Sequence, residues 1–166
     1  MPPSKPADPA QARLDRLVEV RRSPVHGLGV FARRDIGAGR VIGHYGGRRY
    51  QAGGSGESAA AQARHARAQA RGLTYVFALS DGSLIDGAQG GNATRHINHS
   101  CAPNCVAWET LDEAGAPQID IEALRHIPAG SELFIDYDLD PGQHDPAAYA
   151  CRCGAPLCRG SMLGAP

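Results

Sequence analysis

Short apolar runs, separated by clusters of glycine, proline, asparagine and aspartate, recur along the chain. Runs of this length between turn-forming residues are typical of short β-strands. Glycine (21 residues) and proline (12 residues) favour many turns over long helices. Strands are expected at residues 17–20, 30–32, 41–45, 74–79, 84–85, 106–108, 119–124 and 132–135. The pattern therefore predicts a mainly β fold.

One segment has the composition of a helix. Residues 58–71, SAAAQARHARAQAR, are rich in strong helix formers but lack large apolar side chains, so we expect an inserted helix that packs weakly. The first twelve residues contain four prolines and are predicted to be flexible. The organisation expected is a flexible tail at 1–16, a domain at 17–140 and a second tail at 141–166.

The composition excludes several classes of protein. Hydrophobic residues make up 42% and charged residues 20% of the 166 residues, which argues against a disordered, collagen-like or coiled-coil chain. The longest apolar run, 75–79, is far shorter than the about 20 residues of a membrane span or the about 7 to 15 of a signal peptide. We therefore expect a soluble, intracellular protein without a membrane partner. The Ala-, Gly- and Arg-rich composition favours a bacterial cytoplasm, with delivery to a host nucleus left open.

A net charge of zero conceals two oppositely charged halves. Residues 1–72 hold 13 basic and 5 acidic side chains, and residues 73–166 hold 4 basic and 12 acidic ones. Either the halves neutralise each other in the fold, or an acidic groove in the second half attracts a basic peptide. Direct binding to nucleic acid is not expected, because no basic motif interleaved with aromatic residues is present.

Three cysteines near the C-terminus form a C-x-C-x4-C motif: Cys151, Cys153 and Cys158. A structural zinc site needs four ligands, so these thiolates would have to recruit one more. The alternatives are a disulfide or free buried thiols. An odd total of five cysteines and the lack of a secretion signal disfavour a disulfide framework. Zinc is the favoured interpretation.

Two further segments carry polar groups suited to a site. Residues 92–104, NATRHINHSCAPN, are dense in Asn, His and Ser, side chains that can grip an amino-acid head group or a purine edge. Residues 132–137, ELFIDY, form a strand that ends in Tyr137. Taken singly, a segment like the first is usually a turn with satisfied hydrogen bonds, and a tyrosine at a strand end is more often a packing residue than a catalytic one.

Taken together and in this order, these motifs resemble the SET-domain protein lysine methyltransferases. The resemblance covers residue 17 to the C-terminus, with a post-SET zinc tail at its end. Its motifs are HGLGVFARRDIGAGRVIGHYGG (26–47), TYVFAL (74–79), IDGAQGGNATRHINHSCAPNC (85–105), IPAGSELFIDYD (127–138) and CRCGAPLCRG (151–160).

The resemblance implies a fold and an activity. The fold is one of small curved sheets, with the N-H-S-C and D-Y segments threaded past each other as a pseudoknot. The activity is methyl transfer from S-adenosylmethionine to lysine in a basic protein such as a histone or histone-like protein. A structural Zn²⁺ would be bound by Cys101, Cys151, Cys153 and Cys158, leaving Cys105 spare.

The resemblance also implies roles for individual residues. Tyr137 and Tyr75 are the implied catalytic residues. Cofactor binding is implied for Gly27, Leu28, Gly29, Tyr75, Arg95, Asn98, His99, Tyr137, Met162 and Leu163, with Asn98 at the amino group and the His99 backbone at the adenine. The substrate channel is implied to consist of Tyr75, Phe134, Ile135 and Tyr137.

The chain departs from the family pattern at four positions. His44 and Arg48 stand where the family has glutamate, His96 where it has phenylalanine, and Ser161 where an aromatic ring lies over the adenine. The alternative to an enzyme is therefore a catalytically idle SET module that serves as a binding or scaffold domain. Retention of both tyrosines, Asn98 and the four cysteines favours the enzyme.

Two finer expectations concern the substrate. A group of acidic residues follows the channel in sequence, which predicts a basic peptide substrate and activity that falls with salt. These residues are Asp136, Asp138, Asp140 and Asp145. Ile135 is apolar at a position where Phe or Tyr often restricts the space beside the lysine nitrogen, which predicts di- or trimethyllysine as the product.

Overall fold

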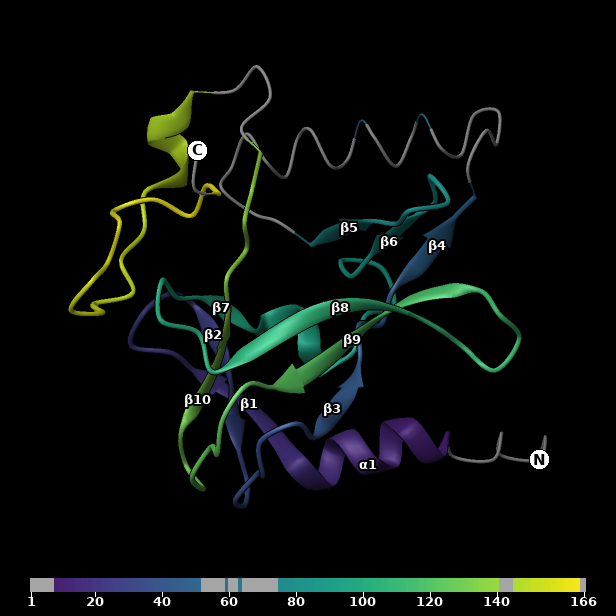
Figure 1. Ribbon diagram of the computed structural model, residues 1–166, viewed down its shortest axis with the longest axis horizontal. Coiled ribbons are helices and arrows are strands. Elements are labelled where there is room, and N and C mark those ends of the chain that lie inside the picture. The colour runs from purple at the N-terminus through teal and green to yellow at the C-terminus, as the bar shows by residue number, and fades with distance from the viewer. Residues whose placement is uncertain (1–7, 52–58, 60–62, 64–74, 141–144, 165–166) are drawn as a thin grey trace.

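The computed structural model describes residues 8–51, 59, 63, 75–140 and 145–164 (Figure 1). Among these, the elements are α1 (Pro9–Leu17), β1 (Val18–Arg22), β2 (Leu28–Ala32), β3 (Val41–His44), β4 (Arg48–Tyr50), β5 (Val76–Ala78), β6 (Leu84–Asp86), the 3₁₀ turn η1 (Ala93–His96), β7 (Asn98–His99), β8 (Cys105–Leu111), β9 (Pro117–Ala123), β10 (Glu132–Ile135) and the 3₁₀ turn η2 (Pro146–Tyr149).

The strands form three small sheets. The first has the order β1-β2-β10-β7, the second β3-β9-β8 and the third β4-β6-β5. The β8–β9 hairpin crosses the front of the molecule, and the third sheet lies apart from it, above it in this view (Figure 1). The predicted mainly β fold of small sheets is confirmed.

Two segments that are distant in the sequence meet in the first sheet. Strands β7 and β10 are parallel, with Asn98 opposite Phe134 and His99 opposite Ile135. Asn104 strengthens this junction, because its side chain donates to the Glu132 carbonyl at 2.8 Å and accepts from the Phe134 amide at 2.8 Å. The N-H-S-C and E-L-x-x-D-Y motifs therefore lie side by side, as the resemblance implies.

Helix α1 occupies residues that the sequence predicts to be a flexible tail. The side chain of Asp8 caps the helix by accepting from the Ala10 amide, and Pro9 takes the first helical position, where a missing N–H costs nothing. Leu14 and Leu17 are buried in the core. The prediction of a tail at 1–16 is thus wrong for residues 9–16: two leucines three positions apart anchor this helix, and residues 1–7 lie outside the described part.

The inserted helix predicted at 58–71 falls outside the described residues, apart from Ala59 and Ala63, which are both helical. The expected strands at 17–20 and 132–135 match β1 and β10 closely, with β1 starting one residue later. Strands β4 and β7 escape prediction, because Arg48, Arg49, Asn98 and His99 lack the alternating apolar pattern.

The core packs where the first two sheets and α1 meet. Val30, Ile42, Ile121 and Leu133 come from β2, β3, β9 and β10, and all four are fully buried. Along β9 the buried positions alternate with partly exposed ones, as expected for a strand with one face inward. This core fixes the end of β10, from which Tyr137 enters the site described next.

Candidate active site and cysteine cluster

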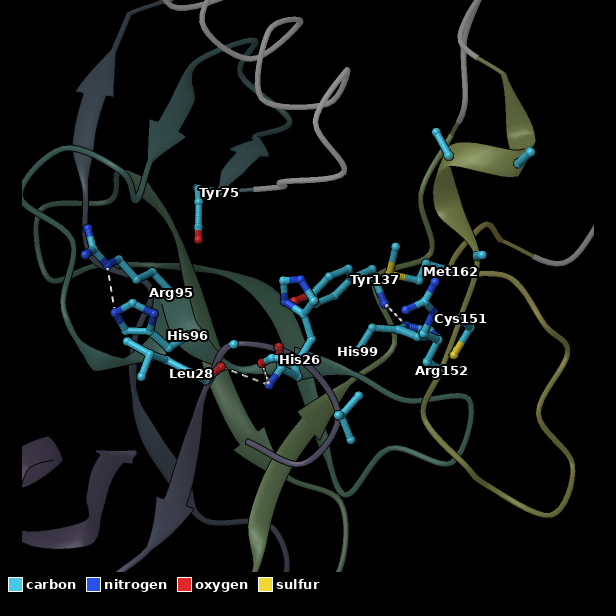
Figure 2. Close-up of a pocket in the computed structure, with 16 residues that line it drawn as sticks. His26, Leu28, Tyr75, Arg95, His96, His99, Tyr137, Cys151, Arg152 and Met162 are labelled. Carbon is cyan, nitrogen blue, oxygen red and sulfur yellow. Dashed lines mark hydrogen bonds between the residues drawn. The ribbon is translucent and has the colours of Figure 1, made fainter. Parts of the chain in front are cut away.

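A cavity of about 470 Å³ lies between the turn before β2, the end of β10 and the C-terminal segment. In Figure 2, Tyr75 points into the gap from above, while Met162, Cys151 and Arg152 close it from the C-terminal segment. The lining residues are Val25, His26, Gly27, Leu28, Tyr75, Arg95, His96, Asn98, His99, Tyr137, Ala147, Ala148, Ala150, Cys151, Arg152 and Met162.

A second, smaller cavity of about 120 Å³ adjoins the first. Arg95 and Tyr137 line both, so the two cavities meet at these side chains. The second cavity is mostly apolar, and its lining residues are Tyr45, Val76, Phe77, Ala78, Thr94, Arg95, Ile97, Ile135, Tyr137 and Leu139. One large cavity and one narrow apolar cavity therefore share a tyrosine at their junction.

Most of the residues implied for cofactor binding lie in the wall of the first cavity, with the exception of Gly29 and Leu163. Of the residues implied for the substrate channel, Ile135 and Tyr137 line the second cavity, Tyr75 lines the first, and Phe134 lines neither. Met162 lines the first cavity, whereas Leu163 does not.

Tyr137 is held firmly at the junction. Its hydroxyl donates to the Ile97 carbonyl at 2.8 Å, and its backbone amide donates to Nδ1 of His99 at 3.1 Å. Burial raises the pKa of the Tyr137 hydroxyl, and the nearby Tyr75 and Glu132 raise this pKa further. The hydroxyl therefore stays protonated at neutral pH and acts as a hydrogen-bond donor in a fixed position.

Tyr45 also lines the smaller cavity, although the sequence does not predict it as a site residue. Its hydroxyl donates to the Tyr75 carbonyl at 2.8 Å, and its ring meets Phe77 edge-on with 4.6 Å between centroids. These contacts fix the backbone at Tyr75 and one apolar wall of the cavity. The only sequence signal is the position of Tyr45 directly before a Gly-Gly pair.

Asn98 joins the turn of the first cavity to the interior. Its amide nitrogen lies 3.2 Å from the His26 carbonyl, 3.0 Å from the Leu28 carbonyl and 2.9 Å from Oε1 of Glu132. Within the described part of the chain, its carboxamide oxygen has no hydrogen-bond partner. That oxygen can therefore accept a hydrogen bond from a ligand.

Gly29 is required by close packing, not by contact with the cavity. A Cβ at this position would overlap the Glu132 carboxylate. We expect Gly29→Ala to lower the free energy of unfolding by about 1–3 kcal/mol, because the buried carboxylate cannot move away freely. Gly37→Ala is the matched control, since a Cβ there meets nothing within 4 Å. Chemical denaturation of both variants tests this, and equal stabilities would contradict it.

Arg95 and His96 form a neutral–cationic pair at the cavity wall. Nε of Arg95 donates to Nε2 of His96 at 3.1 Å, and Nη1 of Arg95 lies 3.2 Å from the Gly87 carbonyl. Burial lowers the pKa of His96, and the Arg95 charge lowers it further. His96 is therefore a neutral acceptor that orients Arg95, a role that the phenylalanine of the family pattern cannot perform.

His99 connects Tyr137 to the cysteine cluster. Because Nδ1 of His99 accepts from the Tyr137 amide, the proton of the neutral ring sits on Nε2. Nε2 lies 3.4 Å from Sγ of Cys101 and donates to that sulfur. Burial lowers the pKa of His99, which favours this neutral form.

The four cysteines of the expected zinc site converge. The Sγ atoms of Cys101, Cys151, Cys153 and Cys158 all lie within 4.8 Å of one another. Cys101 is 3.7 Å from Cys151 and 3.8 Å from Cys158. Zn–S bonds of about 2.3 Å in a tetrahedron place the sulfur atoms about 3.8 Å apart, so the arrangement fits Zn²⁺. These distances are far too long for a disulfide.

Cys105 stands apart from this cluster, as the resemblance implies. It is fully buried at the start of β8. Burial raises the pKa of its thiol to about 12, although Arg125 partly opposes the effect. Cys105 is therefore an inert core thiol.

The C-terminal segment is also tied to β10 by an ion pair. The guanidinium of Arg159 donates to both carboxylate oxygens of Asp136 at 2.7 Å and also contacts the Leu163 carbonyl. The hydrogen bond from Arg159 lowers the pKa of Asp136. Asp145 accepts from the Ala147 amide and caps η2. Of the acidic group predicted to attract a basic peptide, Asp136 is thus neutralised within the fold.

Several wall residues have no signal strong enough to find them from sequence. Ala147, Ala148 and Ala150 enter the cavity only because η2 packs there. Arg152 lies between Cys151 and Cys153, at the position of the C-x-C motif that can be any residue. The C-terminal segment therefore contributes more residues to the cavity wall than Met162 alone.

Comparison with known proteins identifies the family of this chain. The family model described as "SET domain" matches residues 27–138. The chain belongs to the SET-domain family. The match spans every strand from β2 to β10 and both segments that meet at Tyr137, and the cysteine cluster lies partly beyond its end.

Curated relatives carry the same domain within much longer proteins. The SET chain is 36% identical over 143 residues to the histone-lysine N-methyltransferase trithorax of Drosophila virilis, covering 86% of this chain and 4% of that protein. It is 34% identical over 153 residues to the Candida albicans histone-lysine N-methyltransferase, H3 lysine-4 specific (92% and 14%). It is 36% identical over 143 residues to human histone-lysine N-methyltransferase 2B (86% and 5%).

These findings bear on the expected bacterial source and on the expected lack of a membrane-spanning segment. The relatives named above come from a fly, a yeast and human, so they give no support to the bacterial source that the composition favours. In the described residues, no helix combines the length and the apolar character needed to span a bilayer.

Proposed function

We propose that this SET protein is an S-adenosylmethionine-dependent protein-lysine N-methyltransferase that acts on a basic protein such as a histone or histone-like protein. The observation that supports this most directly is the meeting of two cavities at Tyr137. Transfer of a methyl group from a large ligand to a protein side chain needs a separate entrance for each reactant and one point at which the two reactants meet. The names of the three relatives point to the same reaction.

The larger cavity suits the methyl donor. Its volume of about 470 Å³ lies in the usual range of cofactor sites, about 300–1,000 Å³. The free carboxamide oxygen of Asn98 can accept from an amino group, and the His26 and Leu28 carbonyls are held in place beside it. When bound, S-adenosylmethionine supplies a methyl group on a positively charged sulfur.

The smaller cavity suits a lysine side chain. A lysine ammonium has no lone pair, so it must lose its proton before it can attack a methyl group. The apolar walls formed by Phe77, Ile97 and Ile135 favour the neutral amine, because desolvation lowers the pKa of a buried lysine. The fixed hydroxyl of Tyr137 then positions the reacting groups in line, a task of alignment more than of proton transfer.

Zinc at the four cysteines would be structural. Cys151 lines the larger cavity, Sγ of Cys101 lies 3.4 Å from Nε2 of the wall residue His99, and the Asp136–Arg159 pair also fastens the C-terminal segment. The metal would therefore hold Met162 and Arg152 over the bound cofactor. No step of the chemistry requires it.

Transfer of tritiated methyl groups tests the proposal. The protein is incubated with labelled S-adenosylmethionine and a panel of histones, histone-like proteins and ribosomal proteins. We expect label in at least one basic protein and its loss when S-adenosylhomocysteine is added in excess. Binding of the cofactor without transfer to any member of the panel would favour the idle-module alternative instead.

The size of the smaller cavity leads to a prediction about the product. Ile135 lines this cavity beside Tyr137 and offers no hydrogen-bond acceptor. A methylated nitrogen can therefore rotate for another round, and we expect di- or trimethyllysine. Ile135→Tyr should shift the product towards monomethyllysine, because the added hydroxyl fills the space and holds the amine.

Mass spectrometry of the product at saturating cofactor measures the shift. Ile135→Leu is the matched control, since it keeps the volume and the apolar character and should leave the product unchanged. Monomethyllysine alone from the wild-type protein at long reaction times would contradict this assignment of Ile135.

A further inference from the structure

Glu132 carries a buried negative charge directly behind the larger cavity. It begins β10 and is only 9% exposed. Its Oε2 accepts from the Ser23 hydroxyl at 3.0 Å, and its Oε1 accepts from the Asn98 amide at 2.9 Å. Both donors are neutral. Within the described part of the chain, no cationic side chain forms an ion pair with Glu132.

The cavity wall in front of Glu132 carries positive charge. Arg95 and Arg152 contribute guanidinium groups to it, and no Asp or Glu is among the described residues that line it. The neighbouring carboxylate of Asp136 is already paired with Arg159. A positively charged ligand in this cavity must therefore find its counter-charge behind the wall, and Glu132 is the unpaired carboxylate in contact with a wall residue, Asn98.

The charge of Glu132 also reaches the junction of the two cavities. It is one of the groups that raise the pKa of the Tyr137 hydroxyl. Interactions between charges persist over longer distances in a protein interior than in water, because the effective dielectric constant is lower. Hydrogen bonds from neutral donors hold the carboxylate in place but do not cancel its charge.

We propose that Glu132 is the counter-charge for the sulfonium of the methyl donor and makes the site prefer S-adenosylmethionine over S-adenosylhomocysteine. This inference rests on the proposed function. The two ligands have the same adenosine and amino-acid groups, but the donor carries one positive charge more than the thioether product. An unpaired buried carboxylate attracts the donor and gives the product no such advantage. Product release is then favoured as soon as the methyl group has left.

A charge-removing substitution isolates this effect. Glu132→Gln keeps the side-chain length, an oxygen to accept from Asn98 and a nitrogen to donate to the Ser23 hydroxyl. Isothermal titration calorimetry gives the dissociation constants of both ligands for the wild-type and variant proteins. We expect the preference for the donor, expressed as the ratio of the two constants, to fall about tenfold in the variant, which corresponds to about 1.4 kcal/mol.

Two variants of Ser23 act on the carboxylate from the other side and leave Glu132 in place. Ser23→Lys puts a cation beside Oε2, and we expect it to lower the same ratio. Ser23→Ala removes the hydrogen bond to Glu132 and those that the hydroxyl accepts from the Val25 and His26 amides, but not the charge. It should change both affinities by the same factor. Ser23→Lys therefore tests the proposal even where Glu132→Gln fails to fold, which far-ultraviolet circular dichroism reveals.

The outcomes separate the two proposals. A wild-type protein that binds neither ligand overturns the proposed function and this inference with it. A wild-type protein that binds both, with a ratio unchanged by Glu132→Gln or by Ser23→Lys, overturns this inference alone and makes Glu132 a support of the fold. A ratio that falls in both variants and stays constant in Ser23→Ala establishes it.

Discussion

Tyr137→Phe should lower the rate of methyl transfer by about a hundredfold or more, because it removes the hydroxyl of a residue that lines both cavities. The ring and its edge-on contact with His99, 5.4 Å between centroids, remain. The Ile97 carbonyl loses its donor, so a loss of about 1–3 kcal/mol in the free energy of unfolding accompanies the change. Initial rates and thermal unfolding are measured together.

Tyr149 provides the matched control for this substitution. It is fully buried, and its hydroxyl has no hydrogen-bond partner among the described residues. Tyr149→Phe should therefore leave both activity and stability unchanged or slightly raise the stability. A wild-type rate in Tyr137→Phe would remove Tyr137 from the mechanism, whatever the control shows.

The second large effect is expected at the cysteine cluster. Cys101→Ser should abolish the binding of one zinc ion per chain, because Cys101 is the ligand from the body of the domain and the other three belong to the C-terminal segment. Without the metal, that segment is held by the Arg159–Asp136 pair and by backbone hydrogen bonds with Leu139, so the affinity for the cofactor should fall as well. Metal analysis by mass spectrometry and calorimetric titration with S-adenosylmethionine measure the two losses.

Cys105→Ala separates this effect from the general loss of a cysteine. Cys105 is buried away from the cluster, and its substitution should keep the zinc while costing some stability. Zinc retained at full occupancy by Cys101→Ser would contradict the four-cysteine site. Absence of zinc from wild-type protein purified without chelators would do the same.

The parts of this site that can be predicted are those encoded by local motifs. The C-x-C-x4-C spacing is enough to identify three cysteines of the cluster, whereas the fourth, Cys101, is implied only by the resemblance to the family. Strand β10 is equally clear, because ELFI contains a continuous apolar run and follows a Pro-Ala-Gly turn. The cysteine triplet and β10 depend on neighbours in the sequence, so a single sequence is enough to find these two features.

The parts that escape prediction depend on partners far away in the chain. Asp136 is expected to attract a peptide because its charge, but not its pairing with Arg159, is visible in the sequence. The packing of Glu132 against Gly29 is a contact across more than a hundred residues, which the local motif does not encode. Helix α1 is not predicted, because its two buried leucines stabilise the helix only by packing against the sheet beneath them.

The proposed function requires this domain to transfer a methyl group to the side-chain nitrogen of lysine. Tandem mass spectrometry of a basic peptide, containing both lysine and arginine and incubated with protein and S-adenosylmethionine, tests it most directly. We expect mass increments of one or more methyl groups confined to lysine, and none with Tyr137→Phe. Unmodified peptide throughout, or methyl groups on arginine, would contradict it.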